Sequence, residues 1–337
     1  MRDGVISFAV LWLCACSTEP AGTSKVQQAE MTIQGTQLQG VQLQGTLAQG
    51  MTLVGFQYAG ATQGGAALAS VRVTGGELVA DLGGTTLHGA GLAGAHVVAQ
   101  AHDPAHPAST ALVEYRITAV EAEAASYDPT GTGGTYLYTL EQNVDGTDTW
   151  QAACQADADG KHVAIPLTAT WDDQGNRVAS SALFTFGCTT GAIAKCYRWG
   201  YRPWVTGYGD LVTAHWACTR VARADYCGNG TSHTRDGTMI NVWDDLPTPG
   251  PIAPHGTTPL GMLFEAGWDT TGAVCFSHAR WLLDGPVILL GCPGRLIAPG
   301  LGILNPTVCD TVAQVLGQAG DAVMFDESNL NLNLDLL

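Results

Sequence analysis

The sequence predicts an α+β fold, with an antiparallel β-rich core followed by a helical, disulfide-stapled C-terminal half. Runs that alternate apolar and polar residues lie between residues 70 and 188, separated by turn signals such as Asp145-Gly146. Eight cysteines fall between residues 154 and 309. Helical spacing of apolar residues appears over 191–200, 211–226 and 309–317. Strands that come before a helical region are typical of α+β proteins.

The predicted strands are short runs rich in β-branched and aromatic residues, each bounded by turn-forming residues. They cover 71–73, 96–98, 111–117, 136–138 and 162–165. Antiparallel pairing is expected because the alternation between apolar and polar residues fits a sheet with one buried face.

The first residues have the pattern of an export signal. Arg2 precedes an apolar run over 5–15 that is too short to cross a bilayer. The run ends in Leu13-Cys14-Ala15-Cys16, which resembles the bacterial lipobox. We therefore predict lipid attachment at Cys16, with Ser17 permitting transfer to the outer membrane, on its periplasmic or cell-surface side. The alternative is a cytosolic chain with an apolar N-terminus.

Charge and hydropathy exclude several function classes. The chain of 337 residues has a formal net charge of -16, which repels phosphate backbones and anionic headgroups. No later segment approaches the roughly eighteen apolar residues of a membrane helix. We predict no nucleic-acid binding, and membrane contact only through the N-terminal lipid.

A five-residue period runs through the segment that follows the signal. Its glycines recur at Gly35, Gly40, Gly45, Gly50, Gly55, Gly60 and Gly65. The spacing resembles pentapeptide repeats, which form β-solenoids. Seven units make few coils, so a Gly/Gln-rich spacer is an equal alternative. A glycine at every fifth position argues against a helix here.

The cysteines predict a covalently crosslinked unit. Without Cys14 and Cys16, an even number remains, which in an oxidising compartment indicates disulfides. The sequence leaves their pairing open. The disulfide candidates are Cys154, Cys188, Cys196, Cys218, Cys227, Cys275, Cys292 and Cys309.

Residues 215–238 resemble the ADYC domain, a family of uncharacterised secreted bacterial proteins named for the four residues that stand here as Ala224 to Cys227. Looser similarity extends to Phe184-Thr185-Phe186 and to the segment from Gly200 to Trp204. The resemblance implies a lipoprotein signal and a Gly/Gln/Leu-rich leader, but no activity or catalytic residue. The predicted organisation is a signal peptide (1–15), linker and repeats (16–66), a β-rich connection (67–110), an ADYC-like domain (111–310) and a C-terminal segment (311–337).

Residues 215–238 have a structural interpretation. On a helix, His215 and Cys218 share a face, Cys227 follows the helix end and Gly228 terminates it. Both cysteines would then be disulfide partners and His215 a packed side chain. A short strand is expected over 239–242.

A catalytic interpretation uses the same residues. Cys227 would be a nucleophile, activated by His215 or His233, with Asp225 or Asp236 orienting the imidazole. No papain-like or caspase-like signature surrounds the cysteine. A secreted cysteine-dependent hydrolase or transferase is therefore the alternative function.

A third interpretation is a metal site. His215 with Cys218, and Cys275 with His278, form mirror-image pairs whose ligand types suit tetrahedral zinc. Oxidation to disulfides competes for both thiols. We predict no metal and no cofactor, with these four residues as the alternative.

The function that the sequence favours is a binding or structural module on an outer-membrane lipoprotein, and an enzyme is the less favoured class. The chain lacks metalloprotease, nucleophile-elbow, phosphate-loop and dinucleotide signatures. Tryptophans that could stack on a glycan or anchor a protein ligand are Trp199, Trp204, Trp243 and Trp268.

Overall fold

The computed structural model describes residues 31–33, 45–128, 130–131, 133–144, 146–235, 237–247, 251–292, 309–318 and 321–330. The predicted signal peptide, the lipid attachment at Cys16, repeat residues 34–44 and Asp236 lie outside the described residues.

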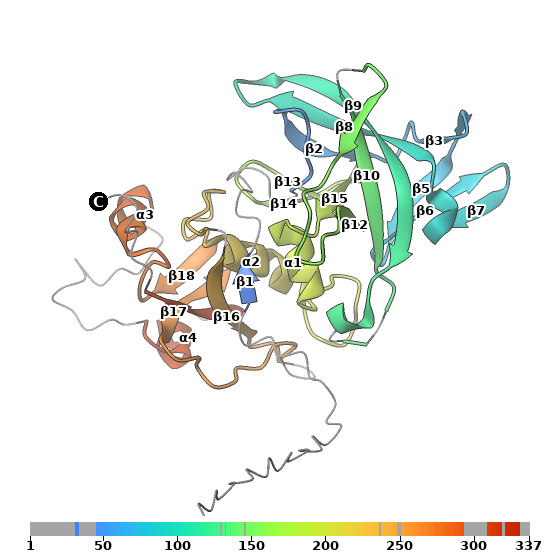
Figure 1. Cartoon of the computed structure of the whole chain (residues 1–337). Coiled ribbons are helices and arrows are strands. Elements are labelled where there is room, and N and C mark those ends of the chain that lie inside the picture. The colour runs from blue at the N-terminus through green and yellow to red at the C-terminus, as the bar shows by residue number, and fades with distance from the viewer. Residues whose placement is uncertain are drawn as a thin grey trace, which may run out of the picture.

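Six antiparallel strands close into a barrel, because each strand pairs with the next and the last pairs with the first (Figure 1). In the order in which they pair, the strands are β2 (Thr52–Gln57), β8 (Ala95–Asp103), β9 (His106–Ala122), β10 (Tyr136–Val144), β12 (Val163–Leu167) and β15 (Leu183–Cys188).

Aromatic rings fill the barrel interior. Phe186 lies at its centre, with ring centroids 5.0 Å from Phe56 and 5.3 Å from Tyr138. Phe56 also lies 4.9 Å from Tyr115. Strand β8 shows the alternation that builds this interior, since Val97 and every second neighbour are buried. The predicted antiparallel β-rich core is confirmed.

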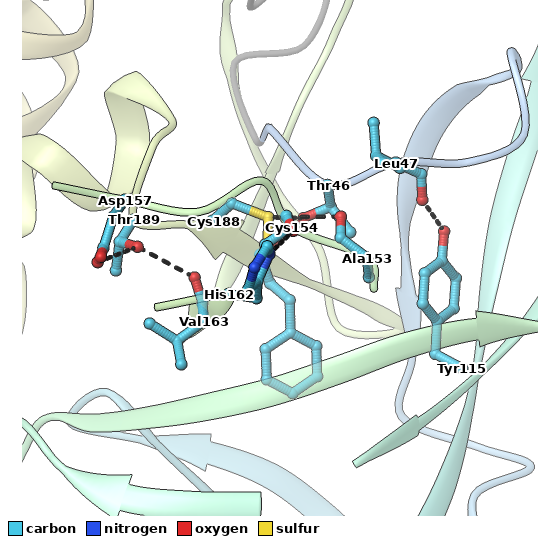
Figure 2. Close-up of a disulfide and its surroundings, with 11 residues drawn as sticks. Thr46, Leu47, Tyr115, Ala153, Cys154, Asp157, His162, Val163, Cys188 and Thr189 are labelled. Carbon is cyan, nitrogen blue, oxygen red and sulfur yellow. Dashed lines mark hydrogen bonds between the residues drawn. A yellow bond between two sulfur atoms is a disulfide. The ribbon is translucent and has the colours of Figure 1, made fainter. Parts of the chain in front are cut away.

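One disulfide and the chain before β2 cover one end of the barrel (Figure 2). Cys154 and Cys188 are bonded, and Thr46 donates a 2.6 Å hydrogen bond to the Phe186 carbonyl beside them. Tyr115 donates to the Leu47 carbonyl at 2.6 Å. Residues 52–57 of the predicted repeat form β2, a strand of the barrel, so this part of it is neither a solenoid nor a spacer.

Smaller β elements surround the barrel. A three-stranded sheet contains β5 (Ala69–Thr74), β6 (Glu77–Leu82) and β7 (Thr85–His88). Strand β13 (Ala169–Trp171) pairs with β14 (Arg177–Ala179). The other short elements are β3 (Thr62–Gln63), β4 (Ala66–Ala67), β11 (Thr149–Ala152) and the 3-10 turns η1 (Gly89–Leu92) and η2 (Ala125–Tyr127).

The C-terminal half is a second antiparallel sheet with short helices. The order of its strands is β1 (Met31–Ile33), β16 (Thr238–Asp244), β19 (Met324–Asn329), β17 (Met262–Asp269) and β18 (Gly272–Phe276). The helical elements are α1 (Ala192–Arg198), α2 (Leu211–Arg223), η3 (Leu282–Asp284), α3 (Gly285–Gly291) and α4 (Val312–Gln318).

The prediction of a helical C-terminal half is wrong, although α1, α2 and α4 lie where helical spacing indicated them. Strands account for 42% of the structure. Most of β17 is buried on both faces, and a strand covered on both faces lacks the alternation that identifies strands in a sequence.

Helices α1 and α2 lie between the barrel and the C-terminal sheet (Figure 1). One continuous apolar cluster joins Ile165 of β12, Ile193 of α1, Ala217 of α2 and Trp268 of β17. The two halves of the molecule therefore share a core. The four residues Ala224 to Cys227, here called the ADYC segment, directly follow the end of α2.

Candidate functional site

Helix α2 ends at Arg223, directly before the four residues Ala224 to Cys227 of the ADYC segment. Ala224 adopts the left-handed conformation, with φ 50°, and is fully buried. Its N–H donates to the Val221 carbonyl at 3.0 Å, and the Asp225 N–H donates to the Arg220 carbonyl at 3.0 Å. These two bonds form a Schellman motif, which glycine usually completes. The segment therefore begins as a sharp helix stop.

Asp225 fixes the turn that follows. It is fully buried and accepts hydrogen bonds from the N–H groups of Asn229 at 3.1 Å and Gly230 at 3.0 Å. It also forms an ion pair with Arg220, at 2.5 Å. Backbone N–H groups and Arg220 occupy both carboxylate oxygens of Asp225, so Asp225 does not orient a catalytic imidazole.

Arg220 also donates hydrogen bonds to two other parts of the chain. Its guanidinium donates to the Gln174 carbonyl at 2.6 Å, in the turn between β13 and β14. It also donates to the Thr270 carbonyl at 3.0 Å, in the turn between β17 and β18. Arg220 thus connects the barrel side of the molecule, α2 and the C-terminal sheet.

Tyr226 inserts into a buried polar network of the C-terminal sheet. Its hydroxyl donates to Glu265 at 2.7 Å and accepts from the backbone N–H of Arg280 at 2.7 Å. The Arg280 guanidinium donates to Glu265 at 3.0 Å and to Asp326 at 2.9 Å. Trp268 donates to Asp326 at 2.7 Å. All five side chains are 0% exposed, so the network is internal.

The pKa values of the two carboxyl groups in this network are shifted in opposite directions. Burial raises the pKa of Glu265, but the adjacent Arg280 outweighs burial and the net pKa is lowered. Burial and the charge of Glu265 raise the pKa of Asp326 well above its usual range. Asp326 is therefore the member of the pair that takes up a proton, and Glu265 is the carboxylate paired with Arg280.

Cys227 ends the segment and is bonded to Cys292, with Cα atoms 5.5 Å apart. The other three pairs are Cys154–Cys188, Cys196–Cys218 and Cys275–Cys309. The predicted disulfides are thus present. A bonded sulfur forms no thiolate, so the alternative of a cysteine-dependent hydrolase or transferase is wrong for this state of the protein.

The histidines of that alternative are engaged elsewhere. His215 is fully buried and hydrogen-bonds the Ile193 carbonyl through Nε2 at 3.0 Å. Burial lowers the pKa of His215 to about 3, so it stays neutral. His233 lies 3.8 Å from Asp284, and burial lowers its pKa as well. Among the described residues, which do not include Asp236, the structure does not bring a nucleophile, base and carboxylate together.

The alternative zinc site is also wrong, because both of its thiols are oxidised. Cys218 is bonded to Cys196, and Cys275 is bonded to Cys309. His278 lies 3.2 Å from the Ser328 hydroxyl. No group of three metal-ligating side chains occurs within the described ranges.

The four tryptophans differ in accessibility. Trp268 is 0% and Trp243 is 5% exposed, so neither presents a ring to a ligand. Trp199 and Trp204 are half-buried and lie at the surface of the shared core. Trp204 packs on the turn between β5 and β6, where a methyl group added to Gly76 would lie 2.7 Å from the indole. That glycine is required for the contact.

Trp204 lines a groove formed by two adjoining hollows of about 320 and 370 Å³, which share Gly133 and Gly134 in their walls. The groove residues come from three parts of the chain, within 74–77, 122–136 and 202–206. The walls are Thr74, Gly75, Glu77, Ala122, Glu123, Ala124, Ala125, Asp128, Gly131, Gly133, Gly134, Thr135, Tyr136, Arg202, Trp204, Val205 and Thr206.

Two deeply buried polar groups in these walls lack partners within the described structure. Arg202 is 1% exposed, and its Nε makes no hydrogen bond, although its Nη1 pairs with Asp128 at 2.9 Å. Thr135 is 5% exposed, and its hydroxyl makes none. The Glu77 carboxylate oxygen that faces His88 at 3.4 Å also lacks a hydrogen bond. Sequence reasoning missed this groove because no local motif joins its parts.

One of three comparisons places the chain among known proteins, and a further finding bears on membranes. None of the helices in the described ranges has the length and hydropathy that a bilayer crossing requires. No curated protein and no solved structure matches the chain. The ADYC domain matches residues 89–282, which overlaps the 111–310 predicted. Because this match covers more than half of the sequence and includes Ala224 to Cys227, the chain belongs to the ADYC domain family.

Proposed function

We propose that the chain is an exported lipoprotein, anchored in the outer membrane through Cys16, whose folded part binds a small polar ligand without catalysing a reaction. Four disulfides support export, because such bonds form in oxidising compartments outside the cytoplasm. The lipobox-like Leu13-Cys14-Ala15-Cys16 supports the anchor.

The groove beside Trp204 is the observation that carries the binding role. Its two hollows, of about 320 and 370 Å³, each have the size of a small-molecule site. Polar residues line both hollows, with Arg202 and Asp128 at the first and Glu77 and Thr206 at the second, so the groove suits a polar ligand.

The residues of the ADYC segment support a non-catalytic role for that segment. Asp225 holds backbone N–H groups, Tyr226 joins an internal network and Cys227 is crosslinked. The side chain at each of these three positions therefore has a structural role.

The anchor is tested by changing Cys16→Ser. The parent should partition with detergent and fractionate with the outer membrane, whereas the variant should remain as an uncleaved or released precursor. Equal detergent partitioning of the two proteins would remove the lipoprotein part of the proposal.

The binding role is tested with the soluble form that starts at Ser17. Calorimetric titration with amino acids, dipeptides and disaccharides should give a signal with at least one class. The substitution Thr206→Arg places a large side chain at the exposed groove rim and should abolish that signal. The matched control is Thr110→Arg on β9, outside the groove. Binding of none of the three classes, or binding that survives Thr206→Arg, would contradict a ligand site here.

A further inference from the structure

Helix α3 and the turn η3 before it expose a cluster of large apolar side chains. Val287 is 62% exposed, Leu290 is 82% exposed, and Leu283 in η3 is 54% exposed. Spacings of four and three residues place these three on one face of a helix. Leu289 is exposed beside them, and we call the four residues the α3 patch. Exposed apolar clusters of this kind mark surfaces that bind a protein or a membrane.

The α3 patch stands on a fixed support. Ile288 of the same helix is 1% exposed and belongs to the shared core. Cys292, directly after α3, is bonded to Cys227. Before η3, the Trp281 indole donates a 3.3 Å hydrogen bond to the Thr238 hydroxyl. These contacts attach the element to the C-terminal region, at the end of the molecule remote from the barrel (Figure 1).

Charge on this surface is sparse and balanced. Asp284 is the only charged residue from Leu282 to Cys292, and it lies 3.5 Å from Arg235. The Arg235 guanidinium also stacks on the Trp281 ring, 4.0 Å from its centroid. Tryptophan and arginine suit the margin of a membrane-bound surface, because each has an apolar body and a polar end that stays hydrated.

The strand that leads to the predicted lipid lies beside this surface. Thr238, which accepts from Trp281, pairs with Ile33 of β1. Met31, at the other end of β1, is fifteen residues after Cys16. A chain of this length spans at most about 50 Å, so a lipid on Cys16 keeps the C-terminal sheet near the bilayer. A surface held this near needs little affinity of its own to make contact.

From these observations we propose that the α3 patch inserts into the headgroup and upper acyl-chain layer of the bilayer that holds the lipid, an inference that rests on the proposed anchor at Cys16. The bilayer that suits the patch is zwitterionic, because anionic headgroups repel the net charge of -16. Apolar helix faces bind membranes in this way, with their side chains buried about 5 to 10 Å. The contact is additional to the lipid and turns the barrel away from the membrane.

Photocrosslinking of the lipidated full chain in phosphatidylcholine vesicles tests this contact. A benzoylphenylalanine probe replaces Leu290, whose exposure leaves room for the larger side chain. The matched control carries the probe at Leu112, which is 66% exposed on barrel strand β9. Both probe variants should melt as the parent does. Lipid adducts at position 290 should exceed those at position 112 by about tenfold, because only position 290 lies in the interfacial layer.

The substitution Val287→Glu, combined with the probe at position 290, adds a charge to the patch. It should reduce the lipid adducts by about tenfold, because a carboxylate is costly to bury among acyl chains. The matched control is Val178→Glu, at a 42% exposed valine of β14, which should leave the adducts unchanged. Both valines are exposed, so neither change should lower the melting temperature.

Lipid adducts at position 290 that Val287→Glu removes and Val178→Glu does not would support the proposal. Adducts with a second copy or within the same chain, in place of lipid, would overturn it, and so would equal lipid yields at positions 290 and 112. If Cys16→Ser partitions with detergent as the parent does, the anchor and this contact both fail. If the anchor stands and position 290 gives no lipid adduct, only the contact fails.

Discussion

The barrel and the C-terminal sheet are both antiparallel, but different interactions stabilise them. The barrel interior is aromatic, with Phe186 in contact with Phe56 and Tyr138, and one disulfide lies at its end. The C-terminal region buries Arg280 with two carboxyl groups and carries the other three disulfides. Burial of apolar area stabilises the barrel interior. Removing one partner of a buried ion pair leaves the other charge uncompensated, so the C-terminal region should be more sensitive to single substitutions.

The ADYC segment lies in the C-terminal region. The ion pair of Asp225 with Arg220 connects it to the barrel side of the molecule. Arg220 contacts the β13–β14 turn and the β17–β18 turn, while Tyr226 and Cys227 attach to the C-terminal region. Perturbations of this segment should therefore affect the C-terminal region more strongly than comparable changes affect the barrel.

The largest effect should come from Arg280→Met, which leaves Glu265 buried without its cation. We expect a loss of about 3 to 5 kcal/mol, the usual result of breaking a buried pair. Denaturant unfolding monitored by tryptophan fluorescence measures it. The barrel control is Arg116→Met, whose ion pair with Glu141 is 37% and 30% exposed and should matter by less than about 1 kcal/mol. Similar losses for both variants would contradict the comparison.

The next effect should come from Cys227→Ser, which opens the bond to Cys292. Removing a native crosslink costs about 2 to 5 kcal/mol, so secretion yield and protease resistance should fall. His233→Ala, which changes a neighbouring side chain, should lower them only weakly. If the histidine variant is as unstable as the cysteine variant, the crosslink is not what supports this region.

Acidification should destabilise the C-terminal region through His215, whose pKa is lowered to about 3 by burial. The folded state holds the neutral imidazole, so its contribution is complete above the ordinary histidine pKa and is lost as pH falls. Between pH 7 and pH 5 the loss should be about 2 kcal/mol. His233 and His278 act in the same direction, because burial lowers the pKa of each.

Comparison with His215→Gln isolates this contribution, because the slope of stability against pH should decrease in that variant. Asp326 acts in the opposite direction, since its raised pKa gives stability that is complete at low pH and lost as pH rises through the raised value. An unchanged slope in His215→Gln would show that His215 is not the group responsible.

The smallest effect should come from Ala224→Gly. The φ of 50° at this position costs an alanine about 1 to 2 kcal/mol, which glycine avoids. After allowance for the greater flexibility of unfolded glycine, we expect a gain of up to about 1 kcal/mol in thermal unfolding. Ala222→Gly, inside α2, should instead destabilise by about 1 kcal/mol. A loss from Ala224→Gly would contradict the helix-stop role.

Sequence patterns predicted the parts of the fold that local chemistry determines. Helix α2 was predictable from apolar spacing over 211–226, and strand β9 from alternation over 111–117. Strand β17 was not, because most of it is buried on both faces. The even number of cysteines indicated disulfides, but their pairing depends on the barrel and sheet that bring distant residues together.

Part of the internal network could have been predicted from the sequence. Glu265 and Arg280 each stand in an apolar run, where a charge requires a partner. Their third partner, Asp326, lies 46 residues beyond Arg280, so the identity of the network needed the sheet. The groove beside Trp204 had no comparable signal, since its donors and acceptors come from three separate segments.

The ADYC segment is a structural junction whose cysteine is crosslinked. This can be tested by peptide mapping of the secreted native protein without reduction, after treatment with an alkylating reagent. We expect a Cys227–Cys292 crosslinked peptide and no alkylated Cys227. Rapid alkylation of Cys227 in the untreated native protein would contradict it.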